Sequence, residues 1–407
     1  MLVQAEALIE SADRIHRPGH LRFLDQHITE VGSNLQPNPG EEVLKLPGLT
    51  LAPGFINLHA HLDLAGLQDR LQPGTDFSEW LRQVISCLPE LTPERRRQSV
   101  TESSRRALRS GTTSVLSILS DPATLGGLTS TCTRTWWALE FMDLHETPKA
   151  TEILDRAKAW LLRHPAAFWH LALSPHSPYT CTPALYRTIV ELATQQSIPF
   201  TTHLAESPEE TLFLAGKRSP LLPLLPKDLC RTDLMEINHS AVDWCKANQI
   251  LPISPILAHG NEVRKTDLDY LAERKATIVH CPKAHKWFGR PPFPYSNYQS
   301  KSIPVCLGTD SPAGSSNSQL DLREEVAEFR LHFPLISTQE AWTMITAGPA
   351  QALQQTSKLG LLSPGAWGDW IAWRVPTEQN PLESILKSRQ IPEWTCVGGV
   401  LNQHESI

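Results

Sequence analysis

From about residue 50 onward, short apolar runs rich in β-branched residues alternate with longer runs whose apolar residues recur at helical spacing. Eight short runs predict strands: Phe55–His59, Thr112–Leu116, Arg134–Leu139, Phe168–Leu173, Ile198–His203, Pro255–His259, Thr277–Cys281 and Ile303–Gly308. The longer runs predict helices: Pro93–Arg109, Thr151–Leu162, Pro183–Gln195, Ser207–Ala215, Thr266–Arg274, Leu320–Leu331 and Thr338–Leu353. Consecutive strand–helix units favour a closed, TIM-like (β/α)8 barrel of the α/β class over an open doubly wound sheet. No Gly-x-Gly-x-x-Gly motif follows an early strand, so a dinucleotide fold lacks its main support.

The two ends of the chain fall outside this alternation. Short strand-like pieces occur at residues 20–24, 27–31 and 42–46, and again at 368–373 and 395–401. Their alternating apolar residues need to be covered, so two unrelated loose tails are the less favoured interpretation. We expect residues 1–50 and 362–407 to form a small β-domain beside a barrel of residues 51–361.

Composition excludes several classes of protein. The 407 residues carry a net charge of −6 without a basic run, which argues against nucleic acid or an anionic membrane as the main partner. The N-terminus lacks the cationic and apolar regions of a signal peptide, and no apolar stretch is long enough to span a bilayer. Eight cysteines without a Cys-x-x-Cys pair are interpreted as reduced, mostly buried thiols, which predicts a cytoplasmic protein.

Candidate metal ligands stand at the ends of predicted strands. His59 and His61 are two residues apart, so in an extended chain both imidazoles point to the same side. His203, His259 and Asp310 end or follow later strands, and strand C-termini converge on one rim of a barrel. Three imidazoles and one carboxylate suit Zn²⁺ or Fe²⁺ with a position left for water. Each residue alone has an ordinary explanation, such as a core histidine at position 203 or a helix N-cap at 310, but the set does not.

As an ordered set, these motifs resemble the amidohydrolase superfamily. The branch they resemble contains adenosylhomocysteine/methylthioadenosine deaminases, guanine deaminases and triazine chlorohydrolases. The matching segments are residues 53–61 (Pro-Gly-Phe-Ile-Asn-Leu-His-Ala-His), 174–181, 203–206 (His-Leu-Ala-Glu), His259, 307–311 (Leu-Gly-Thr-Asp-Ser), 321–325 and 360–369, so the similarity covers nearly the whole chain.

The resemblance implies a role for each matching residue. His59, His61, His203 and Asp310 would bind the metal, which lowers the pKa of its water to about 7. Asp310 would also accept that water's proton, and His259 would orient the water. Glu206 would pass a proton to a substrate ring nitrogen and then to the leaving group; its alternative is a carboxylate at a helix N-terminus.

The resemblance also implies a single ion, most readily Zn²⁺, with Fe²⁺ as the alternative. Superfamily branches with two metals use a lysine at the end of the fourth strand, and residues 173–176 (Leu-Ser-Pro-His) contain none. His176 would touch the substrate, as the matching histidine does in the branch. Its alternative is a loop histidine beside Tyr179.

Two loops depart from the branch. Residues 280–294, after the seventh strand, are aromatic and basic, and the loop after the third strand is acidic (Glu140, Asp143, Glu146). Relatives that bind carboxylate-tailed nucleosides carry arginine in that third loop, which argues against adenosylhomocysteine as the substrate. We expect flat pocket walls from Trp80 and Trp287, and polar contacts from His285 or Arg290. Alternatively, Trp80 belongs to an amphipathic helix and Trp287 anchors a structural loop.

The leading hypothesis is therefore hydrolytic deamination of a small aminated heterocycle, such as an adenine nucleoside derivative. Dechlorination or hydrolysis of a cyclic amide or imidate by the same residues is a second enzymatic reading. A non-catalytic barrel scaffold is the rival from another class, and the complete ligand set disfavours it. The expected partner is a small molecule, and a homodimer stays open.

Overall fold

The computed structural model describes residues 1–72, 76–144, 147–164, 168–226, 240–376 and 379–404. Eight parallel strands form two four-stranded sheets. The first sheet contains β6 (Phe55–Ala60), β7 (Thr112–Leu119), β8 (Arg134–Phe141) and β9 (Trp169–Pro175) in that order. The second contains β10 (Thr201–Leu204), β11 (Ile256–His259), β12 (Thr277–His280) and β13 (Val305–Leu307). All eight predicted strands are confirmed, with small shifts at their ends.

The two sheets meet at both of their outer edges. A parallel bridge pairs Leu173 of β9 with Phe200 just before β10, and another pairs Ala60 of β6 with Asp310 after β13. Gly308 permits the second contact, because a Cβ there would lie 2.8 Å from both the Cβ and the carbonyl oxygen of His59. Only glycine therefore fits where β13 ends against β6.

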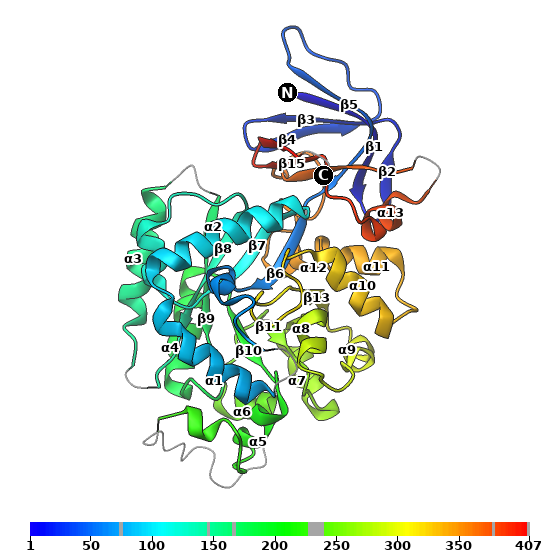
Figure 1. The fold of residues 1–407 in the computed structure, drawn as a ribbon. Coiled ribbons are helices and arrows are strands. Elements are labelled where there is room, and N and C mark those ends of the chain that lie inside the picture. Colours follow the sequence, from blue (N-terminus) through cyan, green and yellow to red (C-terminus); the bar gives the residue numbers. More distant parts are fainter. Residues whose placement is uncertain (73–75, 145–146, 165–167, 227–239, 377–378, 405–407) are drawn as a thin grey trace.

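Helices cover the outside of these sheets (Figure 1). The helices that lie between β6 and β10 in the sequence are η1 (Leu62–Leu67), α1 (Phe77–Cys87), η2 (Leu88–Glu90), α2 (Pro93–Arg109), η3 (Pro122–Gly127), α3 (Ala150–Leu162) and α4 (Pro183–Gln196). The later ones are α5 (Pro208–Leu214), η4 (Leu222–Leu224), α6 (Ala241–Asn248), η6 (Lys265–Asp267), α7 (Leu268–Glu273), α8 (Pro282–Trp287), α9 (Tyr295–Ser300), α10 (Leu322–His332), α11 (Thr338–Thr343), α12 (Ala347–Ala352) and α13 (Pro381–Lys387). Helix α2 has the predicted bounds, since Thr92 caps its first turn and Pro93 occupies its first position.

One predicted helix is wrong as a single element. The run Thr338–Leu353 is divided into α11 and α12, with Thr346 in a non-helical conformation between them. Pro349 cannot continue a helix from the preceding turn, because its ring clashes with the carbonyl four residues earlier. The break frees the Ile345 carbonyl to accept a hydrogen bond from Ile56 N in β6 (2.8 Å).

The remaining strands form one eight-stranded sheet from both ends of the chain. Its strands are β1 (Leu2–Ser11), β2 (Arg14–His16), β3 (Gly19–Leu24), β4 (His27–Gly32), β5 (Val43–Pro53), β14 (Trp370–Arg374), β15 (Trp394–Val397) and β16 (Val400–Gln403). Strand β14 pairs with β5, so the C-terminal segment completes the N-terminal sheet, and both termini lie in this part of the molecule (Figure 1). The sequence did not predict β1, which is paired on both sides with β3 and β5.

A buried ion pair links this sheet to the parallel strands. Arg134 at the start of β8 donates two hydrogen bonds to Asp369, just before β14 (2.7 and 3.0 Å). Its guanidinium also lies 3.8 Å from the ring centroid of Trp367. The pair is satisfied in a bidentate geometry and therefore ties the two parts of the chain together.

No helix in the described part of the chain is long and apolar enough to cross a membrane. Seven of the eight cysteines are described, and none of these seven is in a disulfide; Cys230 lies outside the described residues.

Candidate active site at the strand ends

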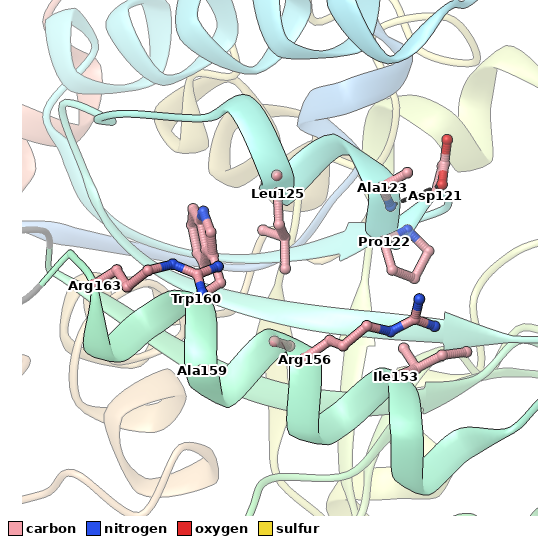
Figure 2. A pocket seen from close by; sticks show the side chains of 11 residues that line it. Asp121, Pro122, Ala123, Leu125, Ile153, Arg156, Ala159, Trp160 and Arg163 are labelled. Carbon is pink, nitrogen blue, oxygen red and sulfur yellow. Dashed lines mark hydrogen bonds between the residues drawn. The ribbon is translucent and has the colours of Figure 1, made fainter.

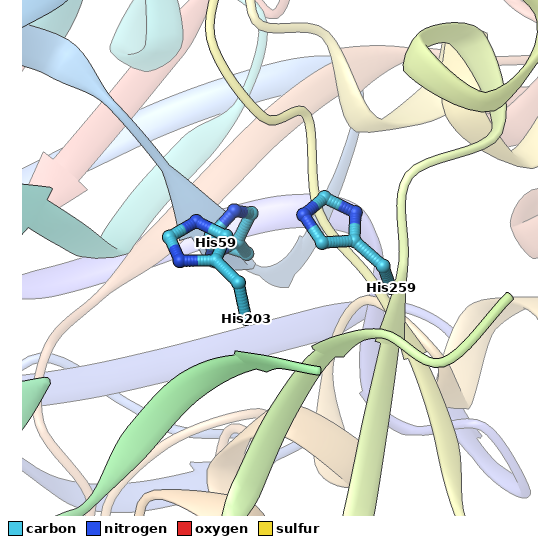
Figure 3. Close-up of side chains that lie close together, drawn as sticks. All are labelled: His59, His203 and His259. Atoms are coloured by element: carbon cyan, nitrogen blue, oxygen red, sulfur yellow. The ribbon is translucent and has the colours of Figure 1, made fainter. Parts of the chain in front are cut away.

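Four histidines and one aspartate meet where the parallel strands end. We call His59, His61, His203, His259 and Asp310 the strand-end cluster. In Figure 3 the rings of His59, His203 and His259 point toward one another from three different strands, and ring nitrogens from each lie within 4.8 Å of one another. His61 Nε2 lies 3.3 Å from His203 Nε2. One oxygen of Asp310 is 3.6 Å from Nε2 of both His59 and His61.

All five residues are buried, which sets their charge. Burial lowers the pKa of His203 to about 4 and holds the pKa values of His61 and His259 well below the usual range. Burial opposes ionisation of Asp310, yet its contact with His59 and the neighbouring imidazoles lowers the pKa of the carboxyl overall. The cluster thus combines the neutral imidazoles of His61, His203 and His259 with a carboxylate, which is the protonation state that metal binding requires.

The residues fit a divalent transition metal. Both ring nitrogens of His59 and Nδ1 of His61 are buried without a hydrogen-bond partner among the described residues. Buried polar atoms are normally satisfied, so Nε2 of His59, the nitrogen that lies near Asp310, needs an occupant that accepts its lone pair. Ligands about 2.1 Å from a tetrahedral ion lie roughly 3.4 Å apart, which matches the separations of 3.3 and 3.6 Å. Imidazoles suit zinc or iron better than magnesium or calcium.

Neighbouring groups hold these side chains in place. Nδ1 of His203 donates to the backbone carbonyl of His176 (3.0 Å), so its Nε2 faces the cluster. His259 and Asp310 both have left-handed backbone conformations (φ of 74° and 57°), which are rare for residues with a Cβ and collect at functional sites. Fully buried Asn57 bonds to Thr309 through both ends of its amide, at 2.7 and 3.2 Å.

Glu206 lies at one side of the cluster, 3.8 Å from Nε2 of His259. Burial raises the pKa of Glu206 to about 8, against the opposing effect of the Arg290 guanidinium, which donates to it at 3.4 Å. Glu210 accepts hydrogen bonds from the backbone amides of Ala205 and Glu206 (3.2 and 2.8 Å), which fixes the loop after β10. Glu206 is therefore a buried acid beside the cluster, in contact with His259 and Arg290.

His285 occupies a supporting position. Its Nε2 donates to the carbonyl of Pro291 (2.7 Å), and its Nδ1 lies 3.1 Å from Oδ1 of Asn261. The Asn261 amide in turn donates to the Glu206 carbonyl (3.0 Å). Both ring nitrogens of His285 are thus occupied by the protein, which differs from the free polar contact that the sequence predicted.

Aromatic residues from helix α1 and from the segment after β12 lie near Arg290. Trp80 lies in α1, as the alternative interpretation expected, and its indole donates to the Ala313 carbonyl in the loop after Asp310 (3.2 Å). The Trp80 ring contacts the Phe288 ring (5.3 Å between centroids). The Arg290 guanidinium lies 5.0 Å from the centroid of the Phe288 ring. Trp287 is half-buried with an indole nitrogen that has no partner among the described residues. Helix α1 and the segment after β12 therefore contact each other beside Glu206.

His176 and Glu140 lie next to His203 of the cluster. Nδ1 of His176 contacts the hydroxyls of Thr180 (2.7 Å) and Ser177 (3.0 Å). Glu140 offers an oxygen within 4.8 Å of ring nitrogens of His176 and His203. Burial, with a smaller contribution from Asp63, raises the pKa of Glu140 to about 8. Of the acidic loop that the sequence indicated, Asp143 caps α4 through Thr182, and Glu146 lies outside the described residues.

Sequence reasoning singled out every member of the strand-end cluster but missed several supporting residues. No sequence pattern marks Glu210 or Asn261 as part of a site. Asn57 lies within the motif of residues 53–61, but nothing in that motif distinguishes it from its neighbours. The cavity of about 490 Å³ between η3 and α3, lined by Leu125, Arg156 and Trp160 among others (Figure 2), includes none of the cluster residues.

Comparison with known proteins agrees with this geometry. The model of the amidohydrolase family matches residues 50–400. The 5-methylthioadenosine/S-adenosylhomocysteine deaminase of Shouchella clausii is 28% identical over 395 residues, which cover 89% of this chain and 82% of that protein.

Two solved structures show the same fold. Helicobacter pylori aminofutalosine deaminase in complex with methylthio-coformycin has a TM-score of 0.82 at 18% identity, covering 98% of this chain and 99% of that one. Atrazine chlorohydrolase from Arthrobacter aurescens, complexed with zinc, has a TM-score of 0.80 at 18% identity, covering 98% and 94%. Because the family model spans most of the sequence, the chain belongs to the amidohydrolase family.

Proposed function

We propose that this protein is a metal-dependent aminohydrolase that removes ammonia from an aminated heterocycle. One observation carries the proposal: Glu206, a buried acid with a raised pKa, lies 3.8 Å from His259 beside the strand-end cluster. An amino-bearing ring carbon becomes a good electrophile once the adjacent ring nitrogen is protonated, and a buried acid at this position can supply that proton. The deaminase names of the curated relatives support the same reaction class.

We propose that His59, His61, His203 and Asp310 hold one divalent ion, with zinc as the first choice. The spacing of their donor atoms and the unpartnered nitrogens of His59 support this assignment. When bound, such an ion makes water acidic enough to supply hydroxide near neutral pH. Relatives in the solved structures were found with zinc, which supports the choice of metal.

The chain's own residues then divide the work. His259, 3.8 Å from Glu206, orients the attacking water through its ring nitrogen. The Asp310 carboxylate accepts the proton that the water loses. Glu206 donates its proton to the substrate ring nitrogen, takes up the proton that Asp310 accepted from the water, and passes it to the departing amine. As the carbonyl forms, the new hydroxyl group returns a proton to Glu206, so that ammonia leaves as a neutral molecule.

The surrounding side chains form the pocket in this proposal. Trp80 and Phe288 supply flat walls for the ring, and Trp287 contributes an indole N–H. Arg290 reaches a polar substituent of the substrate while it stays in contact with Glu206. We assign His285 a positioning role, because both of its nitrogens already hold Pro291 and Asn261.

We further infer that the two parallel sheets form one eight-stranded (β/α)8 barrel. The bridges Leu173–Phe200 and Ala60–Asp310 support closure at both edges. We also infer that residues 1–50 with 362–407 form a small β-domain beside the barrel of residues 51–361. The pairing of β14 with β5 supports that division.

Ammonia release tests the function. Purified protein with zinc is incubated with adenosine, 5′-methylthioadenosine, guanine, a pterin and an aminotriazine, and free ammonia is measured. We expect at least one compound to release ammonia in proportion to product, and Glu206→Gln to lose that release. If no amine is released but a chlorinated triazine yields chloride, the chain is a chlorohydrolase and the proposal is wrong.

A further inference from the structure

Glu140 is a buried carboxylate in the candidate site that the proposed reaction leaves without a task. It lies near the end of β8 with only 9% of its surface exposed, and Oε1 is completely enclosed. None of the described residues donates a hydrogen bond to it. A buried carboxyl group without a hydrogen-bond partner is unfavourable in a typical protein, so such a residue needs a compensating role.

Glu210 and Glu325, two other fully buried acids, are satisfied by the protein. Glu210 accepts from two backbone amides, and Glu325 accepts from the Lys283 amide (2.9 Å) and the Asn317 side chain (2.7 Å). The unpartnered state of Glu140 is therefore a local feature, and we infer that its partner arrives with a ligand.

Arg96, a cation close enough to lower the pKa of Glu140, is already engaged elsewhere. Arg96 donates to Asp63 (3.1 Å), to the Ser120 hydroxyl (2.6 Å) and to the Leu91 carbonyl (3.2 Å). Asp63 itself is fully buried and also accepts from Ser120. Arg96 and Asp63 neutralise each other. Neither of them satisfies the carboxyl group of Glu140, which is left for another partner.

Position restricts which part of a substrate can reach Glu140. One of its oxygens lies within 4.8 Å of ring nitrogens of His176 and His203. If His203 binds an ion at the usual distance of about 2.1 Å, Glu140 lies within roughly 7–9 Å of that ion. Glu206 lies next to His259. A group that touches Glu140 therefore belongs to the substrate ring or is attached directly to it, not to a long tail.

Burial raises the pKa of Glu140, and a ligand N–H group that donates to it lowers that pKa again by stabilising the carboxylate, which accepts hydrogen bonds and repels ring acceptors. The adenine ring of a nucleoside, substituted at N9, has only one amino group, which is the one that leaves, and its remaining ring nitrogens are acceptors.

We infer that Glu140 determines specificity by accepting a hydrogen bond from a second N–H or amino group on the ring, which favours diamino and amino-oxo heterocycles over adenine. This inference rests on the proposed function for the orientation of the ring.

Equilibrium binding of a matched pair tests the inference. 2,6-Diaminopurine riboside and adenosine differ by one amino group, and both are titrated calorimetrically into the zinc-loaded Glu206→Gln protein, in which turnover is suppressed. We expect the diaminopurine riboside to bind at least tenfold more tightly, because a site built to accept a hydrogen bond discriminates strongly against the analogue without the donor. Adding Glu140→Gln is expected to reduce the preference to less than threefold with unchanged zinc content. Glu152→Gln, at an exposed position on α3, is the matched control and keeps the preference.

Three outcomes overturn the inference. Equal binding of the two purines, or a preference that survives Glu140→Gln, removes Glu140 from recognition. Loss of a second zinc equivalent in Glu140→Gln makes the residue a metal ligand instead. A wild-type protein that binds the diamino compound selectively but releases no ammonia supports the role of Glu140 while contradicting deamination, so the two failures are distinguishable.

Discussion

Asn57 and Thr309 are joined by two hydrogen bonds although 252 residues separate them in the sequence: the Asn57 amide donates to the Thr309 hydroxyl (2.7 Å) and accepts from the Thr309 amide (3.2 Å). Asn57 precedes His59 by two residues, and Thr309 precedes Asp310. The pair therefore sets the distance between two of the proposed metal ligands, one from the first parallel strand and one from the last.

Asn57→Ala is expected to weaken zinc binding. It leaves the buried Thr309 groups without their partner, and loss of groups that orient metal ligands typically costs about 10–100-fold in affinity. Competition with a chromophoric chelator measures the affinity. Asn248→Ala, which removes a half-buried amide bonded to the Trp244 carbonyl, is the control and should bind zinc like the parent. Unchanged affinity in Asn57→Ala would show that the pair does not position the ligands.

Glu206→Gln should retain its zinc and lose turnover. The side chain moves protons in the proposed mechanism and ligates nothing, and general acid–base groups typically contribute about 10²–10⁴-fold. Metal content and kcat are measured on the same preparation, with Glu209→Gln as the neighbouring control. Loss of zinc, or a rate close to that of the parent, contradicts the assigned role.

Arg290→Ala should shift the pH dependence of kcat/KM. Burial raises the pKa of Glu206 to about 8, and the Arg290 guanidinium opposes that rise. Since the protonated acid is the active form, activity falls as pH rises through this pKa. Removing the opposing cation raises the pKa further, so the alkaline limb moves to higher pH. Arg82→Ala, at an exposed position on α1, leaves the profile in place. A limb that stays fixed or moves to lower pH refutes the proposed coupling.

Arg134→Ala is expected to destabilise the fold. The Arg134–Asp369 pair is almost fully buried (3% and 2% exposed), and breaking such a pair leaves an uncompensated charge at a cost of about 3–5 kcal/mol. Denaturant unfolding measures the loss. The exposed pair of Arg374 and Glu393 provides the comparison, where Arg374→Ala should cost at most about 1 kcal/mol. Similar losses in the two variants would remove the special role of the buried pair.

Much of the parallel-strand region could be predicted from sequence, because its strands are buried on both faces and appear as short continuous apolar runs. Strand β1 was missed for the converse reason. Ala5, Glu6 and Ala7 have low strand propensity, and the pairing of β1 with both β3 and β5 determines its structure. The break between α11 and α12 depends on Pro349 and on the hydrogen bond from Ile56 N to the Ile345 carbonyl. The periodicity of apolar residues does not reveal either of them.

The candidate site divides in the same way. His59, His203 and Asp310 could be predicted to meet, since strand C-termini converge in barrel folds. The contacts of Asn57, Asn261 and Glu140 could not, because each depends on the distance between side chains from separate strands. His285 illustrates the limit: its sequence suggested a substrate contact, whereas its neighbours occupy both ring nitrogens.

Titration of the metal-free protein with zinc tests the central claim most directly. Ammonia release from the best amino-heterocycle found is followed at each addition. We predict no release without metal and a linear rise that reaches its plateau at one equivalent of zinc per chain. A plateau at two equivalents, or full release after exhaustive chelation, would contradict a single-metal deaminase built on His59, His61, His203 and Asp310.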